Sequence, residues 1–194
     1  PGICADGKLM CLEGALTTMC EPLVQPGDKA ENSCFSPEDS NCDGIVNNNC
    51  NCPIPPSTTT YHYVDPAGSD TDNNCTNASS PCQTIAHAIS QASAGDTLLL
   101  SAGTFNEHDI DIKKTLYIYG SGAMLSIVDA QALGRGFFVR GDGTHASFCG
   151  ITVTRGTTTD IGGGIVVAGT TSEQTTAAIT SCSISNNSAR QGGG

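Results

Sequence analysis

Cysteine placement constrains this chain more than any other feature of its sequence. Of its eleven cysteines, seven lie in the first 52 residues: Cys4, Cys11, Cys20, Cys34, Cys42, Cys50 and Cys52. So short a segment cannot bury enough apolar surface to fold without cross-links, and this density is typical of disulfide scaffolds in oxidising compartments. We therefore predict a secreted, extracellular protein that begins with a disulfide-rich module of little regular structure over residues 1–52. Structural zinc is the alternative, but zinc sites use paired short spacings that this segment lacks.

Charge and hydropathy exclude several partners. The formal net charge is −11, so nucleic acid and anionic membrane surfaces are poor partners and hard cations are better ones. No run approaches the roughly 20 apolar residues of a membrane span, so we expect no membrane insertion. The first residue is Pro1, and we expect that a signal peptide has been removed.

The pattern changes after the cysteine-rich segment. Residues 53–60, rich in Pro and Thr, indicate an extended linker. Tyr61–Val64 is a predicted strand, and an apolar stripe over residues 84–92, ended by Gly95, predicts one short amphipathic helix. Short predicted strands then follow one another without further helices. They cover Thr97–Ser101, Ile110–Ile112, Thr115–Tyr119, Leu125–Asp129, Gly136–Arg140, Ser147–Thr154, Gly164–Ala168 and Ala177–Ser185.

An internal repeat indicates a solenoid. Two glycine triplets, 162–164 and 192–194, lie thirty residues apart, and each follows a similar β-type run. Only 38% of the chain is hydrophobic and 5% aromatic, which suits a repetitive fold built on aliphatic ladders. The last triplet should lead into another inner strand and none follows, so we expect either a fragment of a longer solenoid or an open C-terminal end that a neighbour covers. An open end is an exposed edge that invites end-to-end stacking.

Specific motifs resemble a known fold family. The stretches YVDPAGSD from Tyr63, PCQTIAHAI from Pro81, AGDTLLL from Ala94 and AGTFNE from Ala102 resemble the opening of pectin-lyase-like right-handed parallel β-helix proteins, in which a helix caps the first coil. The later ITVTRG and SISNNSA segments with their glycine triplets resemble bacterial surface and adhesin-type members. The resemblance covers residues 61–194 and implies an all-β solenoid with one capping helix. It implies little about activity, since lyases, hydrolases and non-enzymes share this scaffold.

A calcium-loop pattern lies within the first module. Asp39, Asn41, Asp43, Ile45 and Asn47 occupy loop positions 1, 3, 5, 7 and 9 of an EF-hand-type loop, with glycine at position 6. The spacing predicts a structural Ca²⁺ site, although a cysteine stands where the bidentate glutamate would be; an Asx-rich turn without metal is the alternative. The surrounding cysteine spacing resembles the MopE-like metal-binding modules of secreted bacterial proteins, which also implies Ca²⁺ here. A loop with Asp70 and Asp72 is a secondary metal candidate.

The remaining cysteines and the sequons give further expectations. Cys75 and Cys82 flank one loop, so we predict a disulfide between them. The register favours Cys182 facing inward as a buried free thiol and Cys149 facing outward. The cysteines at 4, 11, 20, 34, 42 and 50 are expected to form disulfides whose connectivity the sequence leaves open. Candidate glycosylation sites are Asn74, Asn77 and Asn186, all in predicted loops.

No pattern predicts an active site. Asp109 and Asp111 share a strand face, but Arg135, Arg140 and Arg155 lack an accompanying carboxylate cluster in the sequence. We therefore expect no catalytic residues and a secreted, non-enzymatic structural or adhesive cell-surface protein. Its expected partners are copies of itself, stacked head to tail into a filament stabilised by Ca²⁺ and disulfides, or other surface proteins and glycans. The alternatives are a polysaccharide lyase or other carbohydrate-active β-helix enzyme fragment, and a simple cation-binding module on a solenoid spacer.

Overall fold

The computed structural model describes residues 9–11, 20–22, 52–53, 55–169 and 174–192. In the first of these ranges the backbone forms β1 (Leu9–Cys11), which pairs antiparallel with β2 (Cys20–Pro22) so that Cys11 lies opposite Cys20. The other predicted features of the first 51 residues lie outside the described residues.

From Tyr61 on, one short helix and a succession of short strands follow each other. They are β3 (Tyr61–Val64), α1 (Ile85–Gln91), β4 (Thr97–Leu100), β5 (Gly103–Phe105), β6 (Ile110–Ile112), β7 (Leu116–Gly120), β8 (Ser126–Asp129), β9 (Phe137–Arg140), β10 (His145–Cys149), β11 (Ile151–Thr154), β12 (Thr157–Ile161), β13 (Ile165–Ala168), β14 (Thr176–Thr180), β15 (Ser183–Ser185) and β16 (Ser188–Gln191).

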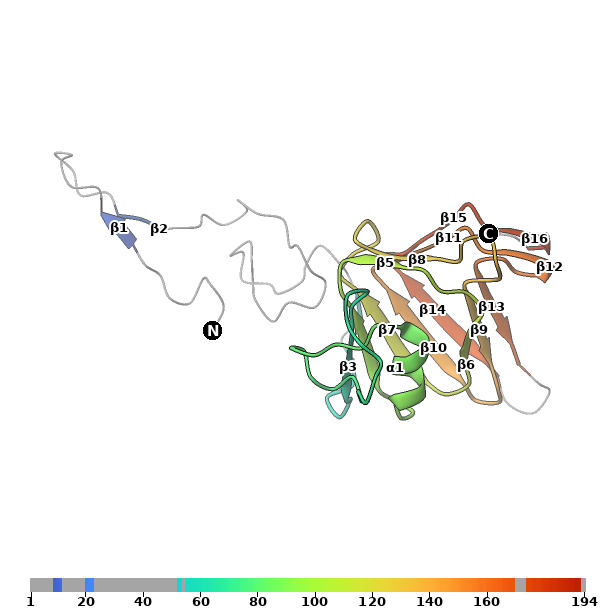
Figure 1. Cartoon of the computed structure of the whole chain (residues 1–194), viewed down its shortest axis with the longest axis horizontal. Coiled ribbons are helices and arrows are strands. Elements are labelled where there is room, and N and C mark those ends of the chain that lie inside the picture. Colours follow the sequence, from blue (N-terminus) through green and yellow to red (C-terminus); the bar gives the residue numbers. More distant parts are fainter. Residues whose placement is uncertain (1–8, 12–19, 23–51, 54, 170–173, 193–194) are drawn as a thin grey trace.

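These strands form stacked parallel sheets. Among the described residues the sheet orders are β3-β4-β7-β10-β14, β5-β8-β11-β15, β6-β9-β13 and β12-β16. From β4 on, consecutive strands lie in different sheets, so the chain returns repeatedly to the same sheets, where β10, β11 and β13 pair with their counterparts β7, β8 and β9 from the preceding pass. Figure 1 shows this progression from green at α1 to red at β14, β15 and β16. The structure is thus mostly parallel β-strands in stacked sheets, which is compatible with a β-helix.

The core is built from side chains that stack in register between neighbouring strands. Leu98, Ile118 and Phe148 are Cα partners on β4, β7 and β10, and all three are fully buried. Phe105, Val128 and Val153 form a second buried stack. Alternate residues of a strand point to opposite faces, so each strand contributes only two or three inward side chains. Short aliphatic ladders therefore suffice to fill the core.

The two ends of this core differ. At the first end α1 buries Ile85, Ala88 and Ile89 against the core cluster, as the helical stripe predicts. At the last end Ile179 continues the stack of Phe148 but is 50% exposed, and Val167, beside Val139, is 43% exposed. The last described layer of the core is therefore only partly covered.

Two predicted strands were wrong in extent because each contains a corner. The predicted strand Ser147–Thr154 divides into β10 and β11 at Gly150, and the predicted strand Ala177–Ser185 divides into β14 and β15 near Ser181. Gly150 has a φ of 66° and Ser181 a φ of 50°. A left-handed residue cannot continue a strand, so the chain turns there into the next sheet.

From Tyr61 on, three of the described strands were not predicted at all, namely β5, β12 and β16. The residues of β12 are mostly exposed and polar, so they lack the apolar alternation that marks a half-buried strand. Glycine is required close to β12, because a Cβ on Gly156 would collide with the carbonyl oxygen of Gly163. Gly163 of the first glycine triplet takes part in this close backbone approach.

Candidate functional site

The Pro/Thr segment is attached to the outer face of the largest sheet. Cys52 forms a disulfide with Cys149 at the end of β10. At the other end Thr59 Oγ1 lies 2.8 Å from Thr97 Oγ1, and the Thr97 N–H donates to the Thr60 carbonyl at 3.0 Å. Because β7 lies between β4 and β10, the two attachment points of this segment lie on the strands that flank β7. We call this segment, of which Ile54 lies outside the described residues, the strap.

Cys149 faces outward, as predicted, and is nevertheless fully buried. It follows the inward Phe148 and lies beside Tyr119, which follows the inward Ile118. Tyr119 is also fully buried despite its outward position. Burial raises the pKa of the Tyr119 hydroxyl, while a hydrogen bond with Ser147 acts in the opposite direction. Sequence reasoning missed the Cys52–Cys149 bridge, because its cysteines lie 97 residues apart and no spacing rule links them.

A shallow groove lies on the same face, next to Tyr119. It has a volume of about 220 Å³, and its floor includes Tyr63, Leu99 and Tyr119, which are Cα partners across β3, β4 and β7. Asp65 and Ser101 contribute polar groups to the lining. The lining combines aromatic and aliphatic side chains with a few polar groups, as ligand sites do, but its volume is below their usual range. This groove and the strap form the candidate functional site.

The predicted disulfide between Cys75 and Cys82 is present, and both cysteines are fully buried. Its loop also occupies the outer edge of β3. The Tyr63 N–H donates to the Cys75 carbonyl at 2.7 Å, and the Cys82 N–H donates to the Tyr63 carbonyl at 2.9 Å. The edge of the largest sheet is therefore already hydrogen-bonded at Tyr63.

In the loop that is the secondary metal candidate, hydrogen-bond donors of the protein surround Asp70. Asp70 accepts hydrogen bonds from the Gln83 N–H at 2.7 Å, the Thr84 N–H at 3.1 Å and the Thr84 hydroxyl at 2.7 Å. Burial alone would raise the pKa of Asp70, but these hydrogen bonds outweigh it and lower the pKa below 3.8. Asp72 is exposed in the same loop, with a φ of 51°. Asp70 thus orders the start of α1.

One Cys/His cluster within the described residues has metal-site dimensions. It consists of Cys75, Cys82 and His87, whose ligand atoms lie within 4.8 Å of one another. The two sulfurs are joined as a disulfide, so neither offers a thiolate to a metal. His87, on α1, places its Nε2 atom 2.8 Å from the Asn73 carbonyl oxygen. This cluster therefore acts as packing for the loop.

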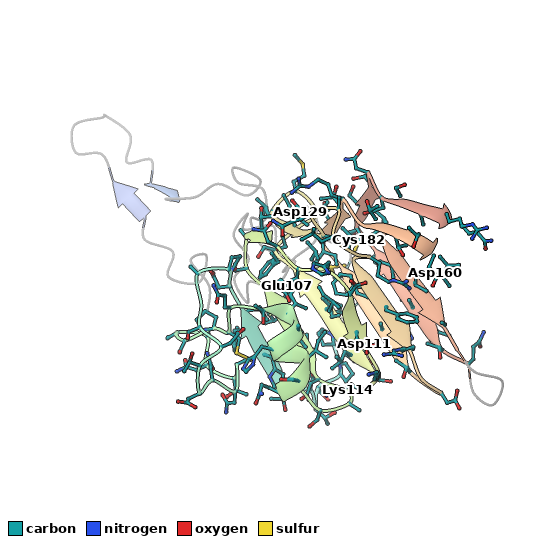
Figure 2. The ribbon with its side chains drawn as sticks, turned by 45° about the vertical axis from the view of Figure 1, so that its right-hand side comes forward. Glu107, Asp111, Lys114, Asp129, Asp160 and Cys182 are labelled. Atoms are coloured by element: carbon teal, nitrogen blue, oxygen red, sulfur yellow. A yellow bond between two sulfur atoms is a disulfide. The ribbon has the colours of Figure 1, made fainter. Side chains whose placement is uncertain are left out.

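Two charged side chains satisfy the ends of α1. The Glu107 carboxylate accepts from the Ile85 N–H at 2.7 Å and the Ala86 N–H at 2.9 Å. Lys114 Nζ donates to the carbonyls of Ile89 at 2.9 Å and Ala92 at 2.6 Å. Burial raises the pKa of Glu107 above 4.5, against the lowering effect of those backbone N–H groups. Figure 2 shows Glu107 and Lys114 next to the helix, where each complements the local end of the helix dipole.

A buried pair joins β3 to the turn before β4. His62 Nε2 lies 3.0 Å from Asp96 Oδ2, and His62 Nδ1 lies 3.2 Å from the Asn74 carbonyl oxygen. Asp96 also accepts the Ser93 N–H at 2.7 Å and the Thr60 N–H at 3.2 Å. Burial raises the pKa of Asp96, but these hydrogen bonds lower it more, so that the net pKa lies below 3.8. The pair fixes the first strands and the end of the strap.

Each of the three arginines has an acidic partner that the sequence pattern does not reveal. Arg140 donates through Nε and Nη2 to both oxygens of Asp111 at 2.7 Å, and Lys113 Nζ lies 2.7 Å from Asp111 Oδ2. These partners come from β6 and β9, neighbouring strands that only the fold brings together. The other two pairings are Arg135 with Asp109 at 3.7 Å and Asp160 at 3.6 Å, and Arg155 with Asp129.

The same face carries one aromatic ring between two cations. The guanidinium groups of Arg135 and Arg140 each lie 5.0 Å from the centroid of the Phe138 ring. Each acid on this face is thus held in an ion pair, which favours a structural role for Asp111. The hydrogen bond from Arg140 is the main cause that lowers the pKa of Asp111 from 3.8 to about 2. Figure 2 shows Asp111 and Asp160 on this side of the sheets and Asp129 apart from them.

Cys182 is a free thiol that packs against the core and is half-buried, so it faces inward as predicted. Burial raises the pKa of its thiol, which keeps it protonated at neutral pH. The three candidate glycosylation residues, Asn74, Asn77 and Asn186, are all exposed. In the first sequon the Thr76 hydroxyl donates to Asn74 Oδ1 at 2.9 Å.

The predicted calcium ligands Asp39, Asn41, Asp43, Ile45 and Asn47 lie outside the described residues, as do Cys4, Cys34, Cys42 and Cys50. Of Cys11 and Cys20 only the backbone is described. Their roles therefore stay predictions.

Along the described parts of the chain, no helix has the length and apolar character needed to span a bilayer. The two disulfides are compatible with an extracellular location. No protein-family model, curated protein or solved structure matches the chain. The likeness to pectin-lyase-like and MopE-like proteins therefore rests on the sequence motifs and stays an expectation.

The Asp111 ion pair predicts a specific pH dependence. A carboxyl whose folded pKa is lowered stabilises the fold above its unfolded pKa, and this stabilisation is lost as the pH falls through the folded value. Asp111→Asn should therefore lower the free energy of unfolding above about pH 4, with the deficit disappearing between about pH 4 and pH 2. Urea unfolding across this range measures it, with Asp72→Asn as a control for an acid in an exposed loop. A deficit that persists unchanged at pH 2 would contradict the assignment.

Proposed function

We propose that the described strands form a right-handed parallel β-helix, and that the protein is a secreted, non-enzymatic structural or adhesive protein of the cell surface. The cyclic order of the strands through three parallel sheets supports the fold. The two disulfides support an oxidising location. The acids of the β6–β9 face support a non-enzymatic role, because Asp109 and Asp111 are held by Arg135 and Arg140. Turnover of polygalacturonate or alginate by the purified chain would contradict this part of the proposal.

The observation that carries the proposal is the difference between the two ends of the core. The first end is closed by α1 and by the loop that occupies the edge of β3 at Tyr63. The other end presents apolar side chains of an incomplete layer. They are the exposed Val167 and Ile179 and the half-buried Ile165, Ala177, Cys182 and Ile184. An apolar layer bordered by strand edges is suited to bind another β-surface.

Self-association is the partner mode we propose. Strand-to-strand head-to-tail stacking would need a free edge on β3, but Tyr63 already pairs with Cys75 and Cys82. In the assembly we propose, the open end of one copy therefore binds a different surface of the next copy, or the open end of that copy. The first arrangement builds filaments and the second closes as a dimer.

A charge placed in the open layer should prevent this association. Ile179→Glu puts a carboxylate beside Phe148 at the exposed end of the core stack, where association would bury it without a partner. Sedimentation velocity over a concentration series should show larger species for the wild-type chain and a single monomer for the variant, with unchanged circular dichroism. Leu133→Glu, at a residue 67% exposed in the turn after β8, is the matched control and should still associate. A wild-type chain that stays monomeric throughout would refute self-association through this end.

We further propose that the loop containing Asp39, Asn41, Asp43, Ile45 and Asn47 binds a structural Ca²⁺ ion. Alternating oxygen ligands with glycine at position 6 support the proposal, and the acidic net charge of −11 favours cation binding.

Removing one oxygen ligand tests this site. Asp43→Ala should weaken Ca²⁺ binding by more than about tenfold in titration calorimetry, because the number of charged ligands sets the affinity of such loops. Asp72→Ala removes an equivalent charge from the other candidate loop and should leave the binding isotherm unchanged. The reverse result would move the ion to the loop of Asp70 and Asp72.

A further inference from the structure

We propose that the Cys52–Cys149 disulfide is a redox latch, whose reduction by a dithiol releases the strap and uncovers the sheet face around Tyr119. This inference rests on the strap and the groove alone and does not depend on the proposed surface function. The change would convert a short groove into a longer surface across β3, β4, β7 and β10.

The strap is attached at two sites on the same outer face. Cys149 follows the inward Phe148, and Thr97 precedes the inward Leu98, so both attachment residues point outward. The strand between their strands is β7, whose outward Tyr119 is 0% exposed. Tyr119 is also part of the groove floor. The two attachment sites of the strap therefore lie on the strands that flank the strand of Tyr119.

The register shows what release would uncover. Tyr63, Leu99, Tyr119 and Cys149 are successive Cα partners across four strands. Tyr63 and Leu99 are half-buried and line the groove, whereas Tyr119 and Cys149 are fully buried. These four residues all point away from the core, so we expect similar exposure for them unless another part of the chain covers some of them. Opening the latch should therefore extend the exposed row from two residues to four.

The two attachments differ in chemistry. The Thr60 end is held by hydrogen bonds, including Thr60 N–H to Asp96 Oδ1 at 3.2 Å and Thr97 N–H to the Thr60 carbonyl at 3.0 Å. Reduction leaves these hydrogen bonds intact. The strap would therefore remain attached at Thr60 while its Cys52 end moves away from β10, and the pairing of the strands would persist. The Cys52 end is held by a covalent bond that only thiol exchange or reduction opens.

The two described disulfides also differ in access. Cys52 is half-buried, while Cys75, Cys82 and Cys149 are 0% exposed. A thiolate reagent must reach one sulfur of a disulfide to open it. Cys52 is the most exposed of these four cysteines, so we expect the latch to open before the Cys75–Cys82 bridge.

The reaction balances with one dithiol. The first thiolate attacks the Cys52 sulfur, forms a mixed disulfide and displaces the Cys149 thiolate, which takes up a proton. The second thiol of the reagent then displaces Cys52 as a thiol and closes the reagent into its own disulfide. The protein gains two electrons and two protons, and the dithiol loses them.

A reductant titration of the intact, oxidised chain tests the proposal. Samples equilibrated with increasing dithiothreitol are quenched by an alkylating reagent, and peptide mapping reports which cysteines are modified. Cys52 and Cys149 should be alkylated at reductant concentrations that leave Cys75 and Cys82 linked. Hydrogen exchange on the same samples should show faster exchange at Thr59, whose N–H donates to the Pro56 carbonyl within the strap, with little change in β10 and β14. Opening of Cys75–Cys82 first, or global unfolding together with latch opening, would overturn the proposal.

A variant pair isolates the latch from other thiols. Cys52→Ser removes the bridge permanently and should reproduce the hydrogen exchange pattern of the reduced wild-type chain. Cys182→Ser removes the free thiol, leaves both bridges intact and should behave as the oxidised wild type. Spectrophotometric titration of the tyrosines adds a second readout, because release should remove part of the burial that raises the pKa of Tyr119. A Cys52→Ser protein with unchanged tyrosine titration and exchange would show that the strap does not cover Tyr119.

Discussion

In-register stacking of inward side chains is the interaction on which the rest of this structure depends. Each described strand has only two or three inward residues, so no single pass of the chain can form a core. Burial arises because Leu98, Ile118 and Phe148 lie directly beside one another on parallel strands. A slip of one residue would move each of them to the outer face. The same register places the partners of the ion pairs, the attachment residues of the strap and the lining residues of the groove beside one another.

The sequence predicts the parts of this fold that have local signals. The strands Tyr61–Val64 and Ile110–Ile112 have the predicted bounds. The predicted helical stripe forms a seven-residue helix that is capped by Thr84. Corners were missed where the backbone turns at Gly150 and Ser181, because apolar alternation continues on either side of the turn. Residues of β12 form a strand mainly through pairing with β16, and such pairing leaves no periodic signal in an exposed polar segment.

The candidate site shows the same division between local and distant information. The Cys75–Cys82 bridge could be predicted because both cysteines flank one loop. The Cys52–Cys149 bridge could not, since it depends on where the strap crosses the sheet. Likewise Asp111 and Arg140 are distant in sequence and become partners only because β6 pairs with β9. Asp70 accepts the N–H groups before α1, a role that its loop position did not signal, and its place as a metal ligand candidate stays a prediction.

The stacking register is the central claim, and NMR on the full-length chain with labelled isoleucine methyl groups and phenylalanine rings tests it most directly. The account predicts nuclear Overhauser contacts from the Ile118 methyls to the Phe148 ring and from that ring to the Ile179 methyls. Contacts displaced by one residue along β10, or an Ile179 that contacts none of these side chains, would contradict it.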